Sequence, residues 1–482
     1  MPTSYREYDP NQGLLLPEDM REWLPDGHLA WHVSELVDGL DLGAFHAPYS
    51  GADGRRNQPY DPRMMVKVLL YAYATGTFSS RKIAGRLEED LAYRVLGAGN
   101  FPAHRTICAF RKRHWKDFEK LFVEVVQLAA RLGFAKFGKV SVDGTKVRAN
   151  ASKRKSKRVE KLSEEEARLR GEVSKLLERA REVDEAEDEK YGPESRGDET
   201  PEKLGDRRAR ARALERAKGE LAEQRRMEKA REARGDAAPE ESKAESDVES
   251  LRRLDAVVEA RENVERDYAE RKEKARERDR KAENGRRVRG PRQKQQGNTT
   301  DADSRVMKTP QEGYQQCYNG QLVVDGEHQV IVAAELVNNG SDHGLLPGQL
   351  DRVEETYGQR PREVLADGGY CNEDDLLELE AGGVEACVNV PKDKRESSRE
   401  KPEQFPATAR MRERMETEAS REAYRERAWR SEAPNGWIKH VLGFRQFSVR
   451  GLEAARGEWN LVCMALNIRR LHGLAASAAG AG

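Results

Sequence analysis

The 482-residue sequence predicts a mixed α/β protein that has an all-helical N-terminal domain and a long charged helical insertion. Three observations predict this arrangement: capped helical patterns at the start, a central stretch where charges replace apolar residues, and alternating strand patterns toward the end. The expected segments are a helical domain at 1–135, a first strand at 136–150, the insertion at 151–300, the rest of the α/β domain at 301–470 and a flexible tail at 471–482.

Residues 1–135 have the apolar spacing of amphipathic helices, as in "PRMMVKVLLYAYATG" and "TICAFRKRHWKDFEKLFVEVVQLAARLG". Several of these runs begin at Ser, Thr or Pro and end at Gly, which are the residues that cap helices. The second run gathers Arg111, Lys112 and Arg113 beside aromatic residues, a pattern that suits contact with DNA phosphates. An ordinary amphipathic helix with a basic outer face explains the same residues, and the pattern leaves both interpretations open.

Residues 151–300 are dominated by Glu, Lys and Arg and contain almost no aromatic residues. Leu162, Leu169 and Leu176 recur every seven residues and form a thin apolar stripe. Such a stripe favours about three long, coiled-coil-like helices over a globular core. We therefore interpret the segment as a solvated helical insertion without chemistry of its own.

The pattern then changes from helical to alternating. "QCYNGQLVVD" and "QVIVAAELV" predict a hairpin, "REVLADGGY" and "VEACVNV" predict two further strands, and a helix opened by Ser341 or Asp342 is expected between them. With "KVSVDG" as the first strand, the element order is that of an RNase H-like mixed sheet with flanking helices, interrupted by the insertion after its first strand.

Two of the predicted strands end alike, because "VSVDGT" delivers Asp143 and "EVLADGGY" delivers Asp367. If the first and fourth strands are neighbours, the two carboxylates emerge side by side and repel unless a divalent cation neutralises them. Carboxylate oxygens suit Mg²⁺ or Mn²⁺, and the five scattered cysteines include no pair at zinc-binding spacing.

A third acid is expected from the helix that contains "YRERAWRSEAPNGWIKH". Glu432 lies there near Arg427 and Lys439, with Tyr424 upstream and Arg445 just beyond. Each of these residues alone is typical of an exposed charged helix, so the prediction depends on the whole set.

These segments resemble, in order, the motif blocks of bacterial insertion-sequence DDE transposases: "VDGTKVRANAS", "DADSRVMKT" with "GYQQCYNGQLVVD", "LADGGYCNEDDL", and the run from "YRERAWRSEAPNGWIKH" to "GEWNLVCMALNIRRL". The N-terminal "YDPRMMVKVLLYAYATGTFSSRKIAGRLEEDLAYRVLG" resembles the helical DNA-binding domain of the same branch. The resemblance covers nearly all of the chain outside the charged insertion.

The resemblance implies that Asp143, Asp367 and Glu432 form a catalytic and metal-binding triad for two Mg²⁺ or Mn²⁺ ions, which act in DNA cleavage and strand transfer. It implies further that Tyr424, Arg427 and Lys439 hold the DNA at the end of the element through its phosphates. Arg445, which follows them in the sequence, is expected to contact the same DNA. The implied partners are double-stranded DNA, both terminal inverted repeats and target DNA, and a second copy of the chain in a synaptic dimer.

The sequence departs from the family pattern at two positions. The number of residues between Arg427 and Glu432 is one greater than in the shortest form of the family motif. Asn435 occupies a position where an aromatic residue is expected. The role of Arg427 therefore stays open at this point, and Glu422 and Glu426 remain rivals for the third acid.

Other classes of function fit the sequence less well. A haloacid-dehalogenase-like phosphatase needs a nucleophilic aspartate two residues before the Asp of its DGT turn, and that position is Ser141. A domesticated or inactive transposase-derived DNA-binding protein is the stronger alternative. The absence of an apolar run of membrane-spanning length or of a leader pattern predicts no membrane partner and a cytoplasmic, nucleoid-associated protein.

Overall fold

The computed structural model describes residues 19–49, 58–191, 240–281, 296–310 and 312–480. The chain divides into one unit made of residues 1–153 and 303–482 and a second unit made of residues 154–302. No helix among the described residues is long and apolar enough to cross a membrane.

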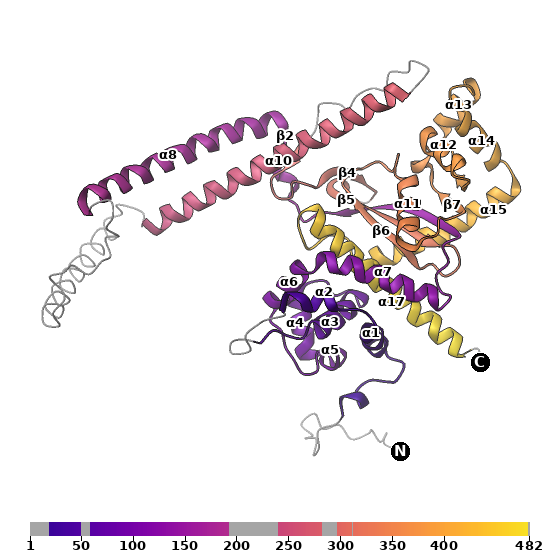
Figure 1. Cartoon of the computed structure of the whole chain (residues 1–482), viewed down its shortest axis with the longest axis horizontal. Coiled ribbons are helices and arrows are strands. Elements are labelled where there is room, and N and C mark those ends of the chain that lie inside the picture. The colour runs from indigo at the N-terminus through magenta and orange to yellow at the C-terminus, as the bar shows by residue number, and fades with distance from the viewer. Residues whose placement is uncertain (1–18, 50–57, 192–239, 282–295, 311, 481–482) are drawn as a thin grey trace, which may run out of the picture. The chain divides into compact units, whose positions relative to one another are not determined.

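Short, capped helices make up the N-terminal part of the first unit (Figure 1). Asp61 caps α3 by accepting a 2.7 Å hydrogen bond from the backbone N–H of Arg63, and Pro62 supplies the first helical residue. Two runs expected to be continuous are each broken in two, at Asp90 and at His114. The helices are α1 Leu29–Asp38, α2 Gly43–His46, α3 Pro62–Ala74, α4 Ser80–Glu89, α5 Leu91–Leu96, α6 His104–Arg113 and α7 Trp115–Arg131.

The C-terminal part of this unit contains a mixed six-stranded sheet. Its strands run in the order β4-β5-β1-β7-β8, and β6 pairs with the same edge of β5 as β4 does. β7 is parallel to β1 and β8 is parallel to β7, whereas β5 is antiparallel to β1. The strands are β1 Lys139–Arg148, β4 Arg305–Thr309, β5 Gly313–Asp325, β6 Ile331–Val337, β7 Glu363–Ala366 and β8 Glu385–Val388.

The Asp-Gly sequence suggested that the first strand ends at Asp143, but β1 does not end there. It continues through Gly144 to Arg148, because β5 is long enough to pair with it from Val140 to Arg148. The parallel pairing with β7 stops earlier, at Val142 opposite Ala366. Asp143 therefore lies in mid-strand, at the point where one of the two neighbouring strands ends.

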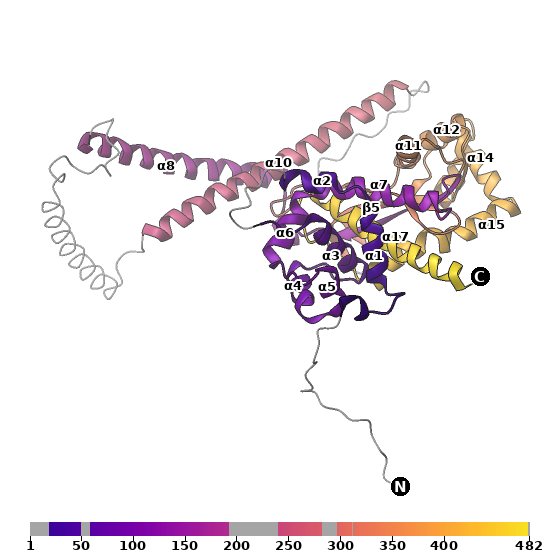
Figure 2. The same cartoon turned by 60° about the horizontal axis from the view of Figure 1, so that its bottom comes forward.

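Helices cover the sheet and continue to the end of the described chain. α17 packs beside α7 and contacts α3 and β6, so the N-terminal helices and the sheet share one core (Figure 2). Trp459 of α17 is fully buried and packs where a Cβ at Gly320 would lie. The helices are α11 Leu346–Tyr357, α12 Glu373–Ala381, α13 Lys392–Glu400, α14 Pro406–Met415, α15 Glu418–Arg427, α16 Ala433–Gly436 and α17 Leu452–Gly480.

Two boundaries differ from the sequence-based expectation. α11 begins at Leu346 rather than at Ser341 or Asp342, because Asp342 turns its carboxylate toward the sheet and does not cap the helix. α17 extends to Gly480 through the predicted flexible tail, and the alanines of this segment have the highest helix propensity of any residue.

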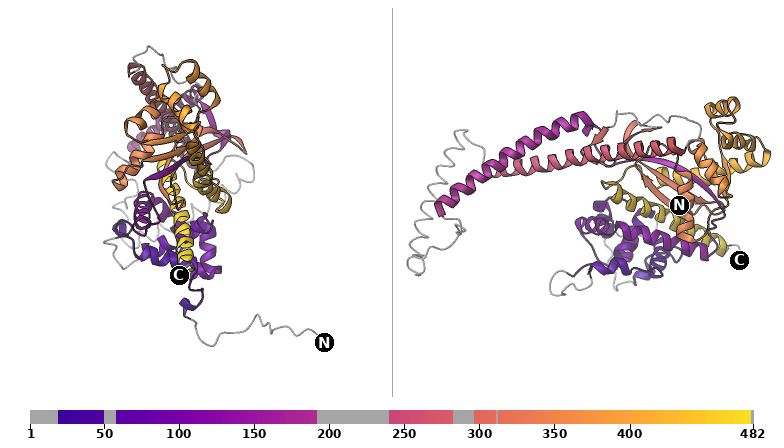
Figure 3. Two further views of the ribbon diagram at one scale, coloured as in Figure 1. Left: turned by 90° about the vertical axis from the view of Figure 1, so that its right-hand side faces the viewer. Right: turned by 45° about the horizontal axis from the view of Figure 1, so that its top comes forward.

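The second unit contains two long helices, α8 Val159–Tyr191 and α10 Glu240–Lys281, which lie side by side (Figure 3). Leu162 and Leu169 are buried against Val257 and Ala260, so the heptad stripe forms a small core. A two-stranded ribbon, β2 Ser156–Arg158 with β3 Gln296–Asn298, adjoins this core. The third helix expected in the insertion would fall in 192–239, outside the described residues.

Candidate active site

Asp143 and Asp367 come from adjacent parallel strands. Val142 pairs with Ala366 as the last residues of the β1–β7 ladder, so the two aspartates are the next residues of each strand in register. Neighbouring strands lie about 4.8 Å apart, so the carboxylates leave the sheet at adjacent points. Oδ1 of Asp367 accepts a 2.8 Å hydrogen bond from the backbone N–H of Gly369, which fixes its orientation at the start of a 3₁₀ turn.

Asn435 and Arg427 face Asp143. Asn435 donates a 2.8 Å hydrogen bond from Nδ2 to Oδ2 of Asp143, and Nη1 of Arg427 lies 3.8 Å from Oδ1. Burial nevertheless raises the pKa of Asp143 to about 6, because these two groups and the backbone only partly offset the lost hydration and the nearby charge of Asp367. The carboxylate therefore lacks full charge compensation.

Arg427 also contacts Glu432. Its Nη2 donates a 2.9 Å hydrogen bond to Oε1 of Glu432, although the two residues are five apart. Residues 428–432 form a π-helical turn, in which i→i+5 bonding brings such residues to one face. Pro434, which has no N–H to donate, follows this turn and interrupts regular α-helical bonding. The π-helical turn thus accommodates the extra residue between Arg427 and Glu432. The guanidinium of Arg427 lies between Asp143 and Glu432.

The rivals for the third acid lie elsewhere. Glu426 pairs with Arg430 at 2.7 Å and lies 3.8 Å from Lys139, the first residue of β1, before the strand reaches Asp143. Glu422 is exposed. Tyr424 packs under the guanidinium of Arg427, with 5.3 Å between the Arg427 Cζ and the ring centroid. Glu432 is therefore the acid of this helix that reaches the Asp143 side of the sheet.

Basic side chains line a pocket beyond the acids. Lys146 and Arg148, from the second half of β1, face Lys439, His440 and Arg445 across it. Burial lowers the pKa of Lys439, although Cys317 and Asp143 act in the opposite direction. Among the residues that the structure describes, Glu312 is the one acid that lines the pocket, and it pairs with Arg148 at 2.9 Å. The arrangement is a mainly cationic surface next to the carboxylates.

Arg111 does not lie where the sequence-based interpretation put it. It is 4 % exposed, and its guanidinium donates to the hydroxyl of Tyr73, the carbonyl of Phe78 and the hydroxyl of Ser80. Its Nη1 also lies 3.9 Å from the fully buried Glu458 of α17. Residues of α3, α4 and α17 surround the guanidinium, so Arg111 is a core residue and not a surface contact.

Lys112 and Arg113 are exposed, and both line a pocket that includes Lys116 and Arg450. Arg113 packs over the ring of Tyr49 at 5.4 Å. The predicted basic patch on the N-terminal domain therefore retains two of its three residues.

Two family descriptions match the chain. "Transposase DDE domain" matches residues 294–468, and "Transposase domain (DUF772)" matches residues 18–113. The chain belongs to the DDE transposases. Comparisons with curated proteins and with solved structures gave no match. The DDE match begins within the last residues of the charged insertion of this transposase and contains Asp367 and Glu432. Asp143 precedes the match and lies beside Asp367 through the pairing of β1 with β7.

Sequence reasoning missed two residues that lie beside the predicted aspartates. Asn435 was noted only as a departure from the motif, and Asp342 only as a possible start of a helix. Oδ1 of Asp342 accepts hydrogen bonds from Nδ2 of Asn319 at 2.7 Å and from Nε2 of Gln321 at 2.8 Å. Both donors are on β5, two residues apart, so they share a face; this period-two pattern of polar residues in an apolar strand was the available signal.

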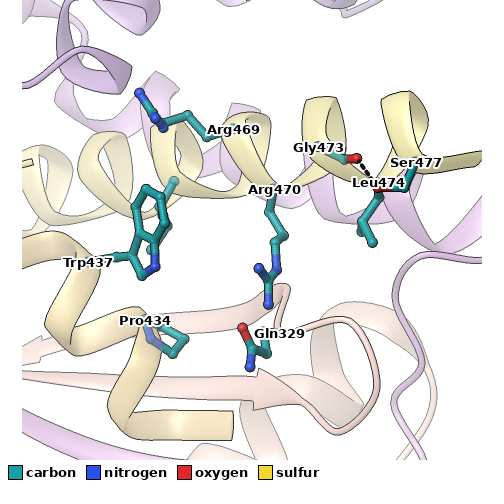
Figure 4. A pocket seen from close by; sticks show the side chains of 9 residues that line it. Gln329, Pro434, Trp437, Arg469, Arg470, Gly473, Leu474 and Ser477 are labelled. Carbon is teal, nitrogen blue, oxygen red and sulfur yellow. Dashed lines mark hydrogen bonds between the residues drawn. The ribbon is translucent and has the colours of Figure 1, made fainter. Parts of the chain in front are cut away.

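A further pocket of the transposase lies apart from the acids. Gln329, Pro434, Trp437, Arg469 and Arg470 line it, and Figure 4 shows the Arg470 side chain extending between α17 and Gln329. Both arginines are engaged, since Arg469 donates to the carbonyl of Ala74 and Arg470 to that of His328. None of the predicted catalytic residues lines this pocket.

Proposed function

We propose that the protein catalyses metal-dependent cleavage and strand transfer at the ends of an insertion sequence, on an RNase H-like catalytic domain. The observation that carries the proposal is the register of Asp143 with Asp367, together with the Arg427 bridge from Asp143 to Glu432. This set of carboxylates and cations suits phosphodiester chemistry, in which charge develops on phosphate oxygens. A transposase-derived protein that only binds DNA would not need these acids and Arg427 to lie together, so their arrangement favours the catalytic function.

The residues fit a divalent cation. Among the described residues, no three acids, imidazoles or thiols lie close enough to hold an ion as they stand. Glu432, the proposed third ligand, is hydrogen-bonded to Arg427, and its side chain is 57 % exposed. The donor set is nevertheless made of hard oxygens. Oδ1 of the buried Asn435, beside Asp143, has no hydrogen-bond partner in the described part of the chain. Asp143, Asp367 and Glu432 are the proposed ligands.

When bound, two Mg²⁺ or Mn²⁺ ions would activate the attacking water or 3′-hydroxyl and stabilise the leaving oxygen. The protein's own side chains orient these groups. Asn435 and Gly369 hold the carboxylates of Asp143 and Asp367 in place. Arg427, supported by Tyr424, supplies positive charge between Asp143 and Glu432, which suits it to face a scissile phosphate.

DNA is proposed to cross the cationic surface next to the acids. Lys439 and Arg445 would contact phosphates of the element end, and Lys146 and Arg148 lie across the same pocket. Lys112 and Arg113 of the N-terminal domain would contact the terminal inverted repeat. Because transposition joins two ends to one target, a dimer is proposed for the synaptic complex.

Cleavage of a duplex that carries the element's own terminal repeat tests the proposal. In Mg²⁺, Asp143→Asn, Asp367→Asn and Glu432→Gln should each abolish nicking while binding to the duplex, followed by gel mobility, is retained. Glu422→Gln is the matched control on the same helical segment and should cleave normally. Binding without cleavage by the unaltered protein would favour the DNA-binding alternative.

A further inference from the structure

The glycines that follow the two aspartates mark a third carboxylate at the same end of the sheet. A Cβ at Gly144 would lie 2.7 Å from Oδ1 of Asp342 and 2.7 Å from Nε2 of Gln321. Real Cβ atoms do not approach other atoms this closely, and Gly144 lies within a regular strand. Gly144 is thus required for the approach of Asp342 and not for a turn.

The second glycine borders the same carboxylate. A Cβ at Gly369 would lie 2.9 Å from Oδ1 of Asp367 and 3.3 Å from Oδ2 of Asp342. The absence of that Cβ leaves a small space that has a carboxylate oxygen from each aspartate at its edge. The "DG" of β1 and the "DGG" after β7 therefore both make room for Asp342.

Amide groups hold Asp342 in a way that leaves one oxygen available. Asn319 and Gln321 donate to Oδ1, whereas no described residue donates a hydrogen bond to Oδ2, the oxygen that faces Gly369. Gln321 in turn accepts a hydrogen bond from the hydroxyl of Tyr370, three residues after Asp367. Burial, and then the charges of Asp342, Asp143 and Asp367, hold the pKa of Tyr370 well above its usual value, so this hydroxyl remains a donor.

Two buried amide oxygens near these carboxylates have no hydrogen-bond partner among the residues that the structure describes. Asn319 is 1 % exposed, and its Nδ2 donates to Oδ1 of Asp342 and to the carbonyl of Asn339. Both partners are acceptors, so the amide cannot be reversed and its Oδ1 is left without a hydrogen bond. Asn435 is 8 % exposed and donates to Asp143 through Nδ2, and its Oδ1 likewise accepts no hydrogen bond from a described residue. Buried oxygens without donors call for a cation or a water bound to one.

We propose that Asp342 is a fourth carboxylate of the metal site, which ligates a divalent cation together with Asp367 through the oxygen that faces Gly369. The inference rests on the proposed function, since it adds a ligand to the same site. Asn319 and Gln321 are positioning residues that orient Asp342 and do not ligate the cation directly. In this assignment Oδ1 of Asn319 accepts a hydrogen bond from a water bound to the cation. The alternative is that Asp342 only fixes the loop before α11.

Binding of Mn²⁺ to the full chain, measured by calorimetry without DNA, tests the assignment. Asp342→Asn keeps an oxygen that can accept from Asn319 and Gln321 but removes the charge, and it should weaken Mn²⁺ binding at least about tenfold. Asp351→Asn is the control, because Asp351 lies on α11 and pairs with Arg360 instead. Its Mn²⁺ affinity should match that of the unaltered protein.

A second variant separates ligation from support of the loop. Asp342→Cys should bind Cd²⁺ with the ultraviolet absorption band of a cadmium thiolate, and Asp351→Cys should not show this band. A missing band in Asp342→Cys, or unchanged Mn²⁺ affinity in Asp342→Asn, overturns the role of Asp342 as a ligand while Asp367→Asn still weakens binding. Failure of the unaltered protein to bind Mn²⁺, or full binding by Asp367→Asn, overturns the proposed metal site itself.

Discussion

Asn435 donates a hydrogen bond to Asp143 across 292 residues of sequence, at 2.8 Å. The position was expected to hold an aromatic residue, and the amide of the asparagine found there supplies this donor. The contact joins the helical segment that carries Glu432 to the middle of β1, so the third acid and the first are held to each other through a neutral donor. The hydrogen bond also explains why the uncharged amide of Asn435 is found beside these acids, since its N–H group is a donor to the carboxylate of Asp143.

Asn435→Ala should slow cleavage about 10- to 100-fold, since residues that orient a metal-binding carboxylate usually contribute that much. The measurement is the rate of single-turnover nicking as a function of Mn²⁺ concentration. A larger Mn²⁺ requirement is expected, because Asp143 loses the donor that orients it. Val441→Ala, at an exposed position of the same helical segment, is the control; equal effects of the two variants would contradict a specific role for Asn435.

Asp143→Asn should stabilise the metal-free protein at pH 7. The pKa of Asp143 is about 6 in the folded chain against 3.8 for the free group, so the folded state holds its proton more tightly. The contribution of this group to stability is present below pH 3.8 and is lost as the pH rises through 6. The expected gain at pH 7 is at most roughly 3 kcal/mol.

Urea unfolding in EDTA at pH 4 and pH 7 measures this effect. The advantage of Asp143→Asn over the unaltered protein should be present at pH 7 and nearly absent at pH 4. Added Mn²⁺ should then stabilise the unaltered protein more than the variant. A variant that is less stable at pH 7 would show that Asp143 is adequately compensated without a cation.

Arg427→Lys should reduce the cleavage rate on the order of 10²-fold, because one ammonium group cannot face Asp143 and Glu432 at once as the guanidinium does. Arg425→Lys, two residues earlier and exposed, is the matched control and should cleave normally. Single-turnover rates at saturating DNA separate this effect from weaker binding. Normal cleavage by Arg427→Lys would remove the bridge from the site.

Arg111→Ala should unfold the first unit more easily, by roughly 3–5 kcal/mol, since it leaves Glu458 buried without its cation. Urea unfolding followed by circular dichroism measures the change. Lys112→Ala, at the next and exposed position, should alter stability by less than about 0.5 kcal/mol. A stable Arg111→Ala protein with impaired DNA binding would restore the original interpretation of Arg111.

Replacing Lys112 and Arg113 together by Ala should weaken binding to the terminal repeat and lower the slope of log K against log salt by about 2, since each lost phosphate contact removes about 0.9. Fluorescence anisotropy over a range of salt concentrations gives the slope. Lys120→Ala with Glu119→Ala, exposed on the neighbouring helix, controls for general surface change. An unaltered slope would place the DNA elsewhere.

Local patterns determined much of this protein. Period-two alternation and the Asp-Gly pairs predicted the strands that carry Asp143 and Asp367, and heptad spacing predicted the paired helices that bury Leu162 and Leu169. These features follow from hydrophobic periodicity and turn chemistry, which act over a few residues. The sequence therefore determined which acids are candidates and on which elements they lie.

Only the tertiary structure decided how those residues meet. The partner of Gly144 is Asp342, nearly 200 residues away, and no local pattern reports which atom occupies the space of a missing Cβ. The burial of Arg111 depends on Glu458 of α17, and the contact of Arg427 with Glu432 depends on a π-helical turn that a proline follows. Burial, long-range pairing and local helix geometry come from packing, and packing is set by the whole chain at once.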